Sequence, residues 1–315
     1  MENIYRMELP VPFATETVNV YLVKGEKLIL IDTGTKTEET RKALNHQLRE
    51  LGYTLSDIDT VIITHHHADH CGLLDDFDED VEVVGHPWNE PWITKSPDFI
   101  QRYERFYENL APQLGIPEVF LKKGPSMTRT LIYSCNRSLT HAVREGDFIR
   151  ALPEFQVIET PGHASTHIAL YRERDGLLIG GDILLDRISS NPLLEPPYYG
   201  EERARPLLQY NESLRRLAQM PISRILTGHG KDVTNVKELV GERLRKQEKR
   251  AGIVLEMLKE KPMTPYEVCV KLFPILYDKQ LALTISETVG QLDFLEYNQQ
   301  VIIDSSSTQW TYYAK

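Results

Sequence analysis

Four histidines and one aspartate lie within six consecutive residues, in the stretch from His65 to His70. Imidazoles this close together repel one another when protonated, whereas bound cations keep them neutral. The apolar run Val61-Ile62-Ile63 directly before them reads as a short buried strand. Sheets of α/β proteins place their sites at such strand ends, which favours a metal site over the alternative, a histidine-rich surface loop.

Three more metal-binding side chains follow predicted strands further along the chain. They are His163 in Thr160-Pro161-Gly162-His163, Asp182 in Gly180-Gly181-Asp182 and His229 in Gly228-His229-Gly230. Small residues flank each one, as needed where backbone comes close to an ion. Together with the cluster at 65–70 they supply enough nitrogen and oxygen ligands for two divalent cations. This ligand chemistry suits zinc, and also manganese, iron or cobalt.

The elements around these residues alternate between strands and amphipathic helices. Two strands over 17–24 and 28–31 form a predicted hairpin, which ends in the turn Asp32-Thr33-Gly34. Further strands are expected over 81–84, 156–159, 167–171, 177–179 and 222–226, and helices over 38–51, 204–218 and 236–260. The second half repeats the pattern of the first, which indicates an α/β fold with the ligands at strand ends.

Residues 87–145 interrupt this pattern with many prolines and short helical pieces. An aromatic stripe at helical spacing runs from Phe99 to Leu110. It either packs the segment onto the main body or forms a lid over a substrate.

The last part of the chain has the element order of a winged helix. A helix begins at Thr264-Pro265 with Glu267 completing a capping box. Another helix over 284–297 and two strands, 301–303 and 310–313, follow. We place a domain boundary near residue 245, which gives a catalytic domain over 1–245, with the insert at 87–145, and a winged-helix domain over 246–315.

Composition limits the classes of function. The 315-residue chain has a formal net charge of −10, and its segment 242–315 holds as many acidic as basic residues. Wholesale electrostatic capture of nucleic acid is therefore not expected. Three scattered cysteines favour a reducing cytoplasm, and no apolar run is long enough for a membrane span.

Together, the H-x-H-x-D-H stretch, Asp32 in D-T-G, and the later His163, Asp182 and His229 resemble the metallo-β-lactamase superfamily over about residues 15–235. The resemblance implies a four-layer αββα sandwich with two divalent metal ions, zinc first and Mn²⁺ or Fe²⁺ as alternatives, and a metal-bridging hydroxide as nucleophile. It implies the following roles: His65, His67 and His163 on the first metal, Asp69, His70 and His229 on the second, Asp182 bridging both, and Asp32 holding a ligand-bearing loop. In the hydrolysis that such a site would perform, either Asp69 or the metal-bound water would relay a proton to the leaving group.

Departures from the family pattern narrow the choice within it. Zinc β-lactamases commonly carry cysteine where this chain has Asp182, so antibiotic hydrolysis is disfavoured. The short segment between Asp182 and His229 leaves no room for the inserted domain of β-CASP nucleases. The C-terminal motifs resemble the winged helix of lactamase-like proteins, including the mitochondrial lactamase-like endoribonuclease.

Several other residues could contribute to the site. Tyr198, in the loop after Asp182, could contact substrate or stabilise an oxyanion as a catalytic residue, or simply pack the loop. His66 is expected to point outward or to brace its loop. His86 is expected to cap or pack, and His167 could support the ligands from behind.

Three functions compete. The first is a hydrolase of a small-molecule ester, thioester or lactone, similar to glyoxalase II and the lactonases. The second is a single-strand RNA endonuclease, for which the basic residues clustered over 243–250 would bind phosphate. The third is a DNA-binding regulator, which would need a basic recognition helix where residues 287–296 hold only acidic charges. Otherwise the winged helix would wall the active site or form a homodimer.

Overall fold

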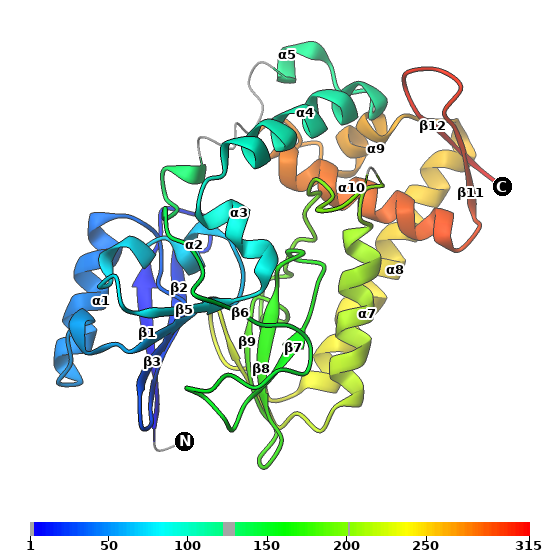
Figure 1. Cartoon of the computed structure of the whole chain (residues 1–315). Helices are drawn as coiled ribbons and strands as arrows, with labels where there is room; N and C mark the ends of the chain where they lie inside the picture. Colours follow the sequence, from blue (N-terminus) through cyan, green and yellow to red (C-terminus); the bar gives the residue numbers. More distant parts are fainter. Residues whose placement is uncertain (1–2, 122–129, 201) are drawn as a thin grey trace.

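The computed structural model describes residues 3–121, 130–200 and 202–315, and contains two β-sheets packed face to face (Figure 1). The first sheet has the strand order β1-β2-β3-β4-β5-β6. Its strands are β1 (Ile4–Pro10), β2 (Thr17–Lys24), β3 (Leu28–Ile31), β4 (Thr60–Ile62), β5 (Glu82–Gly85) and β6 (His141–Ala142). The predicted hairpin of β2 and β3 is confirmed, with Lys24 paired to Leu28. The sequence analysis missed β1, the outer partner of β2.

The second sheet has the order β10-β9-β8-β7. Its strands are β7 (Gln156–Glu159), β8 (Ile168–Arg172), β9 (Leu177–Gly181) and β10 (Arg224–Thr227). The strands β3, β4 and β5 run parallel in the first sheet, and β9 and β10 run parallel in the second. Since parallel strands end at the same edge, the loops after β4, β9 and β10 can meet at one place.

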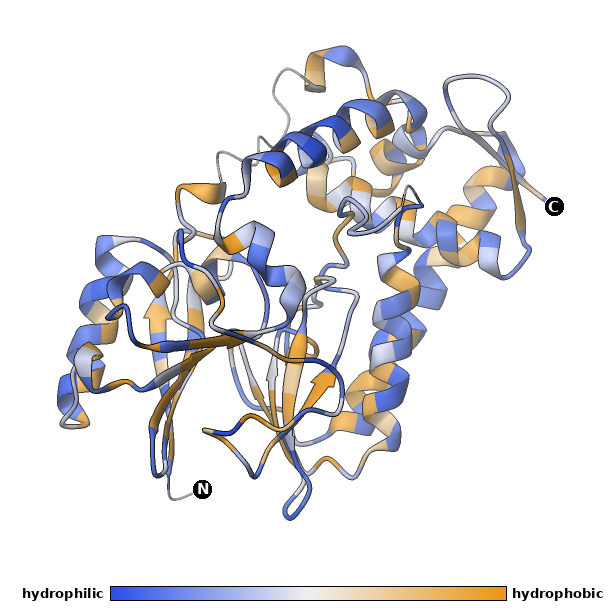
Figure 2. Ribbon diagram, viewed as in Figure 1, coloured by the Kyte–Doolittle hydropathy of each residue, from blue (hydrophilic) through white to orange (hydrophobic). Residues whose placement is uncertain are grey.

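Helices cover the outer faces of both sheets and complete four layers. The helix α1 (Glu38–Glu50) packs on the first sheet, and α7 (Pro206–Gln219) and α8 (Val236–Glu260) pack on the second. A core between the sheets joins residues such as Ile31 and Ile62 to Leu170 and Ile179. In Figure 2 the strands are mostly orange and the solvent sides of the helices blue, as this layering requires.

Short helices fill the connections of the first half. They are η1 (Leu55–Asp57), α2 (Ala68–Cys71), η2 (Leu74–Asp76), η3 (Pro87–Asn89), α3 (Glu90–Ile93) and α5 (Glu118–Leu121). The main helix of the insert is α4 (Pro97–Gln113). Phe106 and Leu110 of its aromatic stripe pack against α10, which agrees with the packing expectation. Tyr103 and Tyr107 line a cavity, and the role of a lid over a substrate stays a prediction.

The C-terminal part contains the predicted helices and hairpin: α9 (Pro265–Leu272), α10 (Leu281–Tyr297), β11 (Val301–Asp304) and β12 (Thr311–Ala314). Thr264 and Glu267 form the expected capping box. The helix α8 runs unbroken through the predicted boundary at residue 245 and contributes to the cores on both sides of it. The winged-helix assignment stays a prediction. No helix in the described parts of the chain is long and apolar enough to cross a bilayer.

Candidate metal centre

The loops at the carboxyl ends of the parallel strands bring all seven predicted metal ligands together. Four groups of metal-binding side chains have donor atoms within 4.8 Å of one another, and three of them consist of predicted ligands: His65, His67 and His163; His65, His70 and Asp182; Asp69, His70 and His229. The first and third of these match the two trios expected from the sequence, and the second joins them. The fourth group is His66, His67 and Glu195, of which only His67 was predicted as a ligand.

Asp182 lies between the two trios. Its Oδ2 is 3.6 Å from Nε2 of His163 and 3.3 Å from Nε2 of His229, and its Oδ1 is 3.6 Å from Nε2 of His70. Asp69 closes the second trio, with Oδ2 3.4 Å from the same nitrogen of His229. One carboxylate can therefore reach both trios, which is the arrangement a bridging ligand needs.

The outer nitrogens of these histidines are held by oxygen acceptors. The Nδ1 of His70 donates to Asp32 Oδ2 at 2.8 Å, that of His163 to the carbonyl of Asn191 at 3.0 Å, and that of His229 to the carbonyl of Thr17 at 2.5 Å. Fixing Nδ1 in this way leaves the Nε2 lone pair free and aimed inward. The same arrangement recurs around many metal-bound histidines.

Asp32 lies where the sequence analysis expected it, behind the ligands. Its carboxylate accepts the backbone N–H and the hydroxyl of Thr64, in addition to the imidazole of His70. The residue is buried and its backbone has φ of 60°, a left-handed conformation that is uncommon outside glycine. Asp32 thus ties the loop after β3 to the start of the ligand loop after β4.

His167 supports the centre from the opposite side. Its Nε2 accepts the backbone N–H of Asp182 at 3.0 Å, and its Nδ1 bonds the hydroxyl of Thr160 at 2.7 Å.

His86, as expected, caps a short helix by accepting the N–H of Trp88.

The donor atoms fit divalent cations. Among the described residues, Nε2 of His70, Nε2 of His163 and Oδ1 of Asp182 are buried without a hydrogen-bond partner. Buried polar atoms are rarely left unpaired in native proteins, so a ligand is expected at this convergence. A set of imidazoles and carboxylates suits zinc, manganese or iron.

The histidine pKa values are shifted in opposite directions on the two sides of the centre. Burial, followed by the neighbouring His163, lowers the pKa of His67 to about 3. Burial also lowers the pKa of His229, but the carboxylates of Asp182 and Asp69 outweigh it and raise that pKa to about 10. A cation bound beside His229 must displace a proton, so binding there weakens as pH falls.

Two glycines make room for this packing. A Cβ on Gly228 would lie 2.2 Å from Oδ1 of Asp182 and 2.9 Å from Cε1 of His70. Gly181 has φ of 48°, and a Cβ there would meet the side chains of His167 and Thr64 below 3.0 Å. These two glycines therefore lie where the neighbouring side chains leave no space for a Cβ atom.

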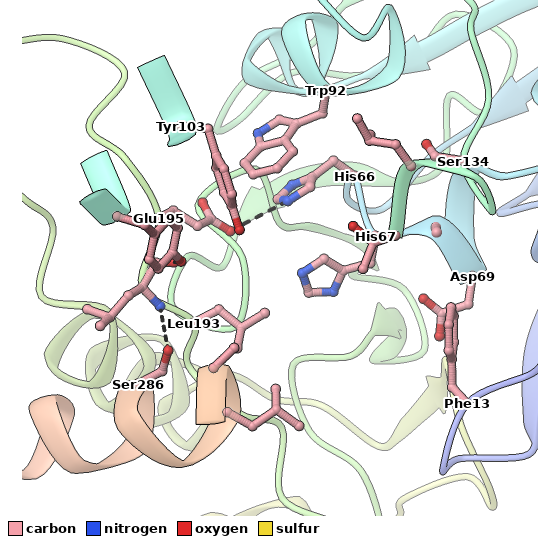
Figure 3. Close-up of a pocket in the computed structure, with 17 residues that line it drawn as sticks. Phe13, His66, His67, Asp69, Trp92, Tyr103, Ser134, Leu193, Glu195 and Ser286 are labelled. Carbon is pink, nitrogen blue, oxygen red and sulfur yellow. Dashed lines mark hydrogen bonds and ion pairs between the residues drawn. The ribbon is translucent and has the colours of Figure 1, made fainter. Parts of the chain in front are cut away.

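A cavity of about 280 Å³ opens directly beside the first trio (Figure 3). His67 and Asp69 form one side of it, and Trp92, Tyr103 and Leu193 lie across from them. The far wall comes from the first turns of α10, through Ala282, Leu283 and Ser286. The C-terminal part of the chain thus reaches the active site.

The expectation that His66 points outward was wrong. Its ring is buried, stacks on Trp92 with centroids 3.9 Å apart, and bonds Thr166 through Nδ1 at 2.9 Å. Tight packing of the insert against the ligand loop draws this ring inside, and alternation along a short loop cannot foresee that.

Tyr198 lies apart from the metal ligands. Its ring stacks on Trp88 with centroids 4.4 Å apart, and its hydroxyl bonds the indole N–H of Trp92. Tyr198 is not among the described residues that line the cavity. The geometry agrees with the packing alternative, and the catalytic role of Tyr198 stays a prediction.

Sequence reasoning missed Glu195. This carboxyl is buried, bonds Ser165, and places Oε1 3.6 Å from Nε2 of His66. Burial raises the pKa of Glu195 to about 7. The only sequence signal was an acidic residue between apolar Leu194 and Pro196, which does not reveal the distant His66.

Comparisons with known proteins agree with this architecture. A sequence model described as the metallo-beta-lactamase superfamily matches residues 15–229. The probable metallo-hydrolase YqjP of Bacillus subtilis (strain 168) is 46% identical over 300 residues, which cover 95% of this chain and 94% of that protein. A metallo-beta-lactamase family protein from Thermus thermophilus superposes with a TM-score of 0.83 at 27% identity, covering 100% of this chain and 99% of the other. A beta-lactamase domain protein from Burkholderia ambifaria shares the fold, with a TM-score of 0.82 at 23% identity over 99% of this chain and 92% of its own.

Proposed function

The chain belongs to the metallo-beta-lactamase superfamily and is a metallo-hydrolase, and we propose that it uses two divalent cations to hydrolyse a small-molecule ester, thioester or lactone. The observation that carries the proposal is the convergence of two ligand trios on Asp182, beside a cavity of small-molecule size. Zinc is the first choice of metal, with manganese and iron as alternatives.

In the proposed mechanism His65, His67 and His163 would hold one cation and Asp69, His70 and His229 would hold the other, with Asp182 within reach of both groups. Cations held there supply Lewis acidity and ionise water at neutral pH. The carboxylate of Asp69 lines both the centre and the cavity. Although burial opposes it, the imidazoles of His70 and His229 bring the pKa of Asp69 down to about 2. An ionised Asp69 suits a metal ligand, and its place on the cavity wall is the basis of its proposed role in relaying a proton to the leaving group.

The alternative of RNA cleavage has weaker support. Arg243 is buried and donates to backbone carbonyls of residues 185–188, Lys246 pairs with Glu242, and Arg250 pairs with Glu287. Three of the basic residues of α8 are therefore paired within the chain, although the pair of Lys246 with Glu242 is exposed. None of the described residues lining the cavity is a lysine or arginine, whereas phosphate binding relies on such residues.

The DNA-regulator alternative conflicts with the position of α10. The helix is buried along most of its length, and its Asp293 pairs with Arg203 at 2.5 Å. A helix enclosed by its own protein cannot lie in a DNA groove.

The test combines metal analysis with turnover of three probes: an acyl thioester, a lactone and a single-stranded RNA. We expect the metal-loaded protein to cleave the thioester or the lactone, and His67→Ala to abolish that activity. The exposed His46→Ala is the matched control and should remain active. Cleavage of RNA alone, lost in His67→Ala, would overturn the proposal in favour of the nuclease. Retention of two metals in His163→Ala would contradict the ligand assignment.

A further inference from the structure

The cavity beside the metal centre has two chemically distinct parts. Most of its wall is apolar, with Leu131, Leu193 and Leu194 facing Ala282 and Leu283 of α10. Its volume of about 280 Å³ is near the lower end of the roughly 300–1,000 Å³ typical of small-molecule sites. An aliphatic chain fits such a wall, because each buried methylene contributes about 0.8 kcal/mol.

The buried pair His66 and Glu195 is one polar part of the cavity, whose lining also includes the hydroxyl-bearing Tyr103, Tyr107, Ser134 and Ser286. The Oε2 of Glu195 is bonded by Ser165, and Nδ1 of His66 by Thr166. Oε1 of Glu195, in contrast, is buried without a hydrogen-bond partner among the described residues. Figure 3 shows this carboxyl between Tyr103 and His66, on the wall of the cavity. A purely aliphatic occupant would leave that oxygen with only the 3.6 Å approach of Nε2 of His66, which is longer than a hydrogen bond.

The cavity is continuous with the proposed reaction centre. His67 and Asp69 belong to the ligand trios and also line the cavity, so an occupant touches both. The part of a substrate that enters here is therefore attached to the bond being cleaved.

We propose that the cavity binds the acyl chain of the substrate, that the chain is apolar, and that it carries a hydrogen-bond donor, such as a hydroxyl, that Glu195 recognises. The proposal rests on the proposed hydrolase function and narrows its substrate class. It also assigns α10 the role of a specificity wall and Glu195 that of a specificity-determining residue. His66, stacked on Trp92, positions the carboxyl from behind.

The first test measures chain-length preference with acetyl and octanoyl thioesters of one thiol. We expect the wild-type kcat/KM to be at least tenfold higher for octanoyl. Ala282→Phe should fill the cavity and lower the octanoyl value, through KM, by at least tenfold more than it lowers the acetyl value. Lys279→Phe, an exposed position just before α10, is the control for an added aromatic ring and should change neither.

A second variant guards against a folding defect in Ala282→Phe. Leu283 is 40% exposed, so Leu283→Ala should fold normally and shift the preference to chains longer than octanoyl. Equal losses on both thioesters in Ala282→Phe, together with an unchanged preference in Leu283→Ala, would overturn the acyl-chain assignment.

The role of Glu195 is tested by the ratio of kcat/KM for hydroxyoctanoyl thioesters to kcat/KM for the octanoyl thioester. Among hydroxyoctanoyl thioesters, one isomer should exceed octanoyl in kcat/KM by about tenfold in the wild type, because one recovered hydrogen bond contributes about 1–1.5 kcal/mol. Glu195→Leu should abolish this preference whatever its absolute rate, and Glu195→Gln should keep part of it. A preference that survives in Glu195→Leu would contradict the role.

The failure of the proposed function can be told apart from the failure of this inference. If no thioester is cleaved, octanoate binding by calorimetry still tests the cavity. Binding by the wild type and by Lys279→Phe, with loss in Ala282→Phe, would support an acyl site without the proposed reaction. If thioesters are cleaved but show no chain-length preference, and octanoate does not bind, the acyl-site inference is wrong while the proposed function stands.

Discussion

At the scale of single residues, the centre depends on side chains that orient other side chains. Each of His70, His163 and His229 contributes one nitrogen to the convergence and commits the other to a protein oxygen. A ligand held in this way loses little rotamer freedom when a cation binds. The supporting residues should therefore affect metal binding without touching the metal.

Asp32→Asn tests this dependence. The amide can still occupy the left-handed backbone, but it offers one acceptor oxygen where Asp32 serves both Thr64 and His70. We expect metal affinity or kcat to fall about 10–100-fold. Metal content under limiting zinc and turnover measure the effect, with the exposed Asp98→Asn as control. Full metal occupancy and activity in Asp32→Asn would show that the contact does not position His70.

The pH dependence of stability tests the environment of Glu195. The unfolded chain releases this proton near pH 4.5, whereas the folded protein keeps it to about pH 7. Between these values the folded state binds more protons, so this carboxyl makes stability fall as pH rises. Glu195→Gln removes that dependence.

The free energy of unfolding is measured with urea at pH 4.5, 6 and 7.5 for the wild type and for Glu195→Gln. The difference, variant minus wild type, should increase with pH by up to about 3 kcal/mol. The exposed Glu79→Gln should show no such trend. A constant difference across this range would mean that Glu195 ionises normally in the folded protein.

At the scale of elements, the ends of parallel strands concentrate the chemistry. Most of the strands could be predicted, because β-branched runs such as Val61–Ile63 alternate with turn residues, although β1 was missed. The grouping of the seven predicted ligands could also be anticipated, since each lies in a loop that follows such a run. The short edge strand β6 and the inward turn of His66 could not, because both depend on how the insert packs against the first sheet.

Gly228→Ala tests the close approach after β10. Its Cβ would meet Oδ1 of Asp182 at 2.2 Å, so this carboxylate, the proposed bridge between the two cations, must move. We expect loss of bound metal and at least a hundredfold loss of activity. Gly252→Ala, with open space around its Cβ inside α8, is the control and should raise stability by about 0.5–1 kcal/mol. Normal activity in Gly228→Ala would contradict the geometry of the bridge.

At the scale of the whole molecule, the predicted boundary at residue 245 falls inside a continuous helix. Leu239 and Val240 of α8 pack against the second sheet, while Val254 and Leu258 pack in the C-terminal core. The buried pair of Arg203 with Asp293 adds a second connection between the two regions. The sequence pattern shows where helices begin and end, but it does not show which cores one helix joins.

We expect the two regions to unfold together. A variant with Trp88→Phe and Trp92→Phe keeps Trp310, in the C-terminal part, as its single tryptophan. Its fluorescence and the circular dichroism of the whole chain should give coincident urea transitions with the same midpoint. Two separated transitions would show that residues 246–315 form an independent domain.

The position of α10 has a consequence for how substrate preference can change. The helix supplies part of the cavity wall, but none of the seven predicted metal ligands lies on it. Substitutions in its first turns can therefore alter which molecules are accepted while the reactive apparatus stays intact. The residues that would select the substrate and the residues that would bind the metals belong to different segments of the chain. Substrate preference can therefore change without loss of the metal-dependent reaction.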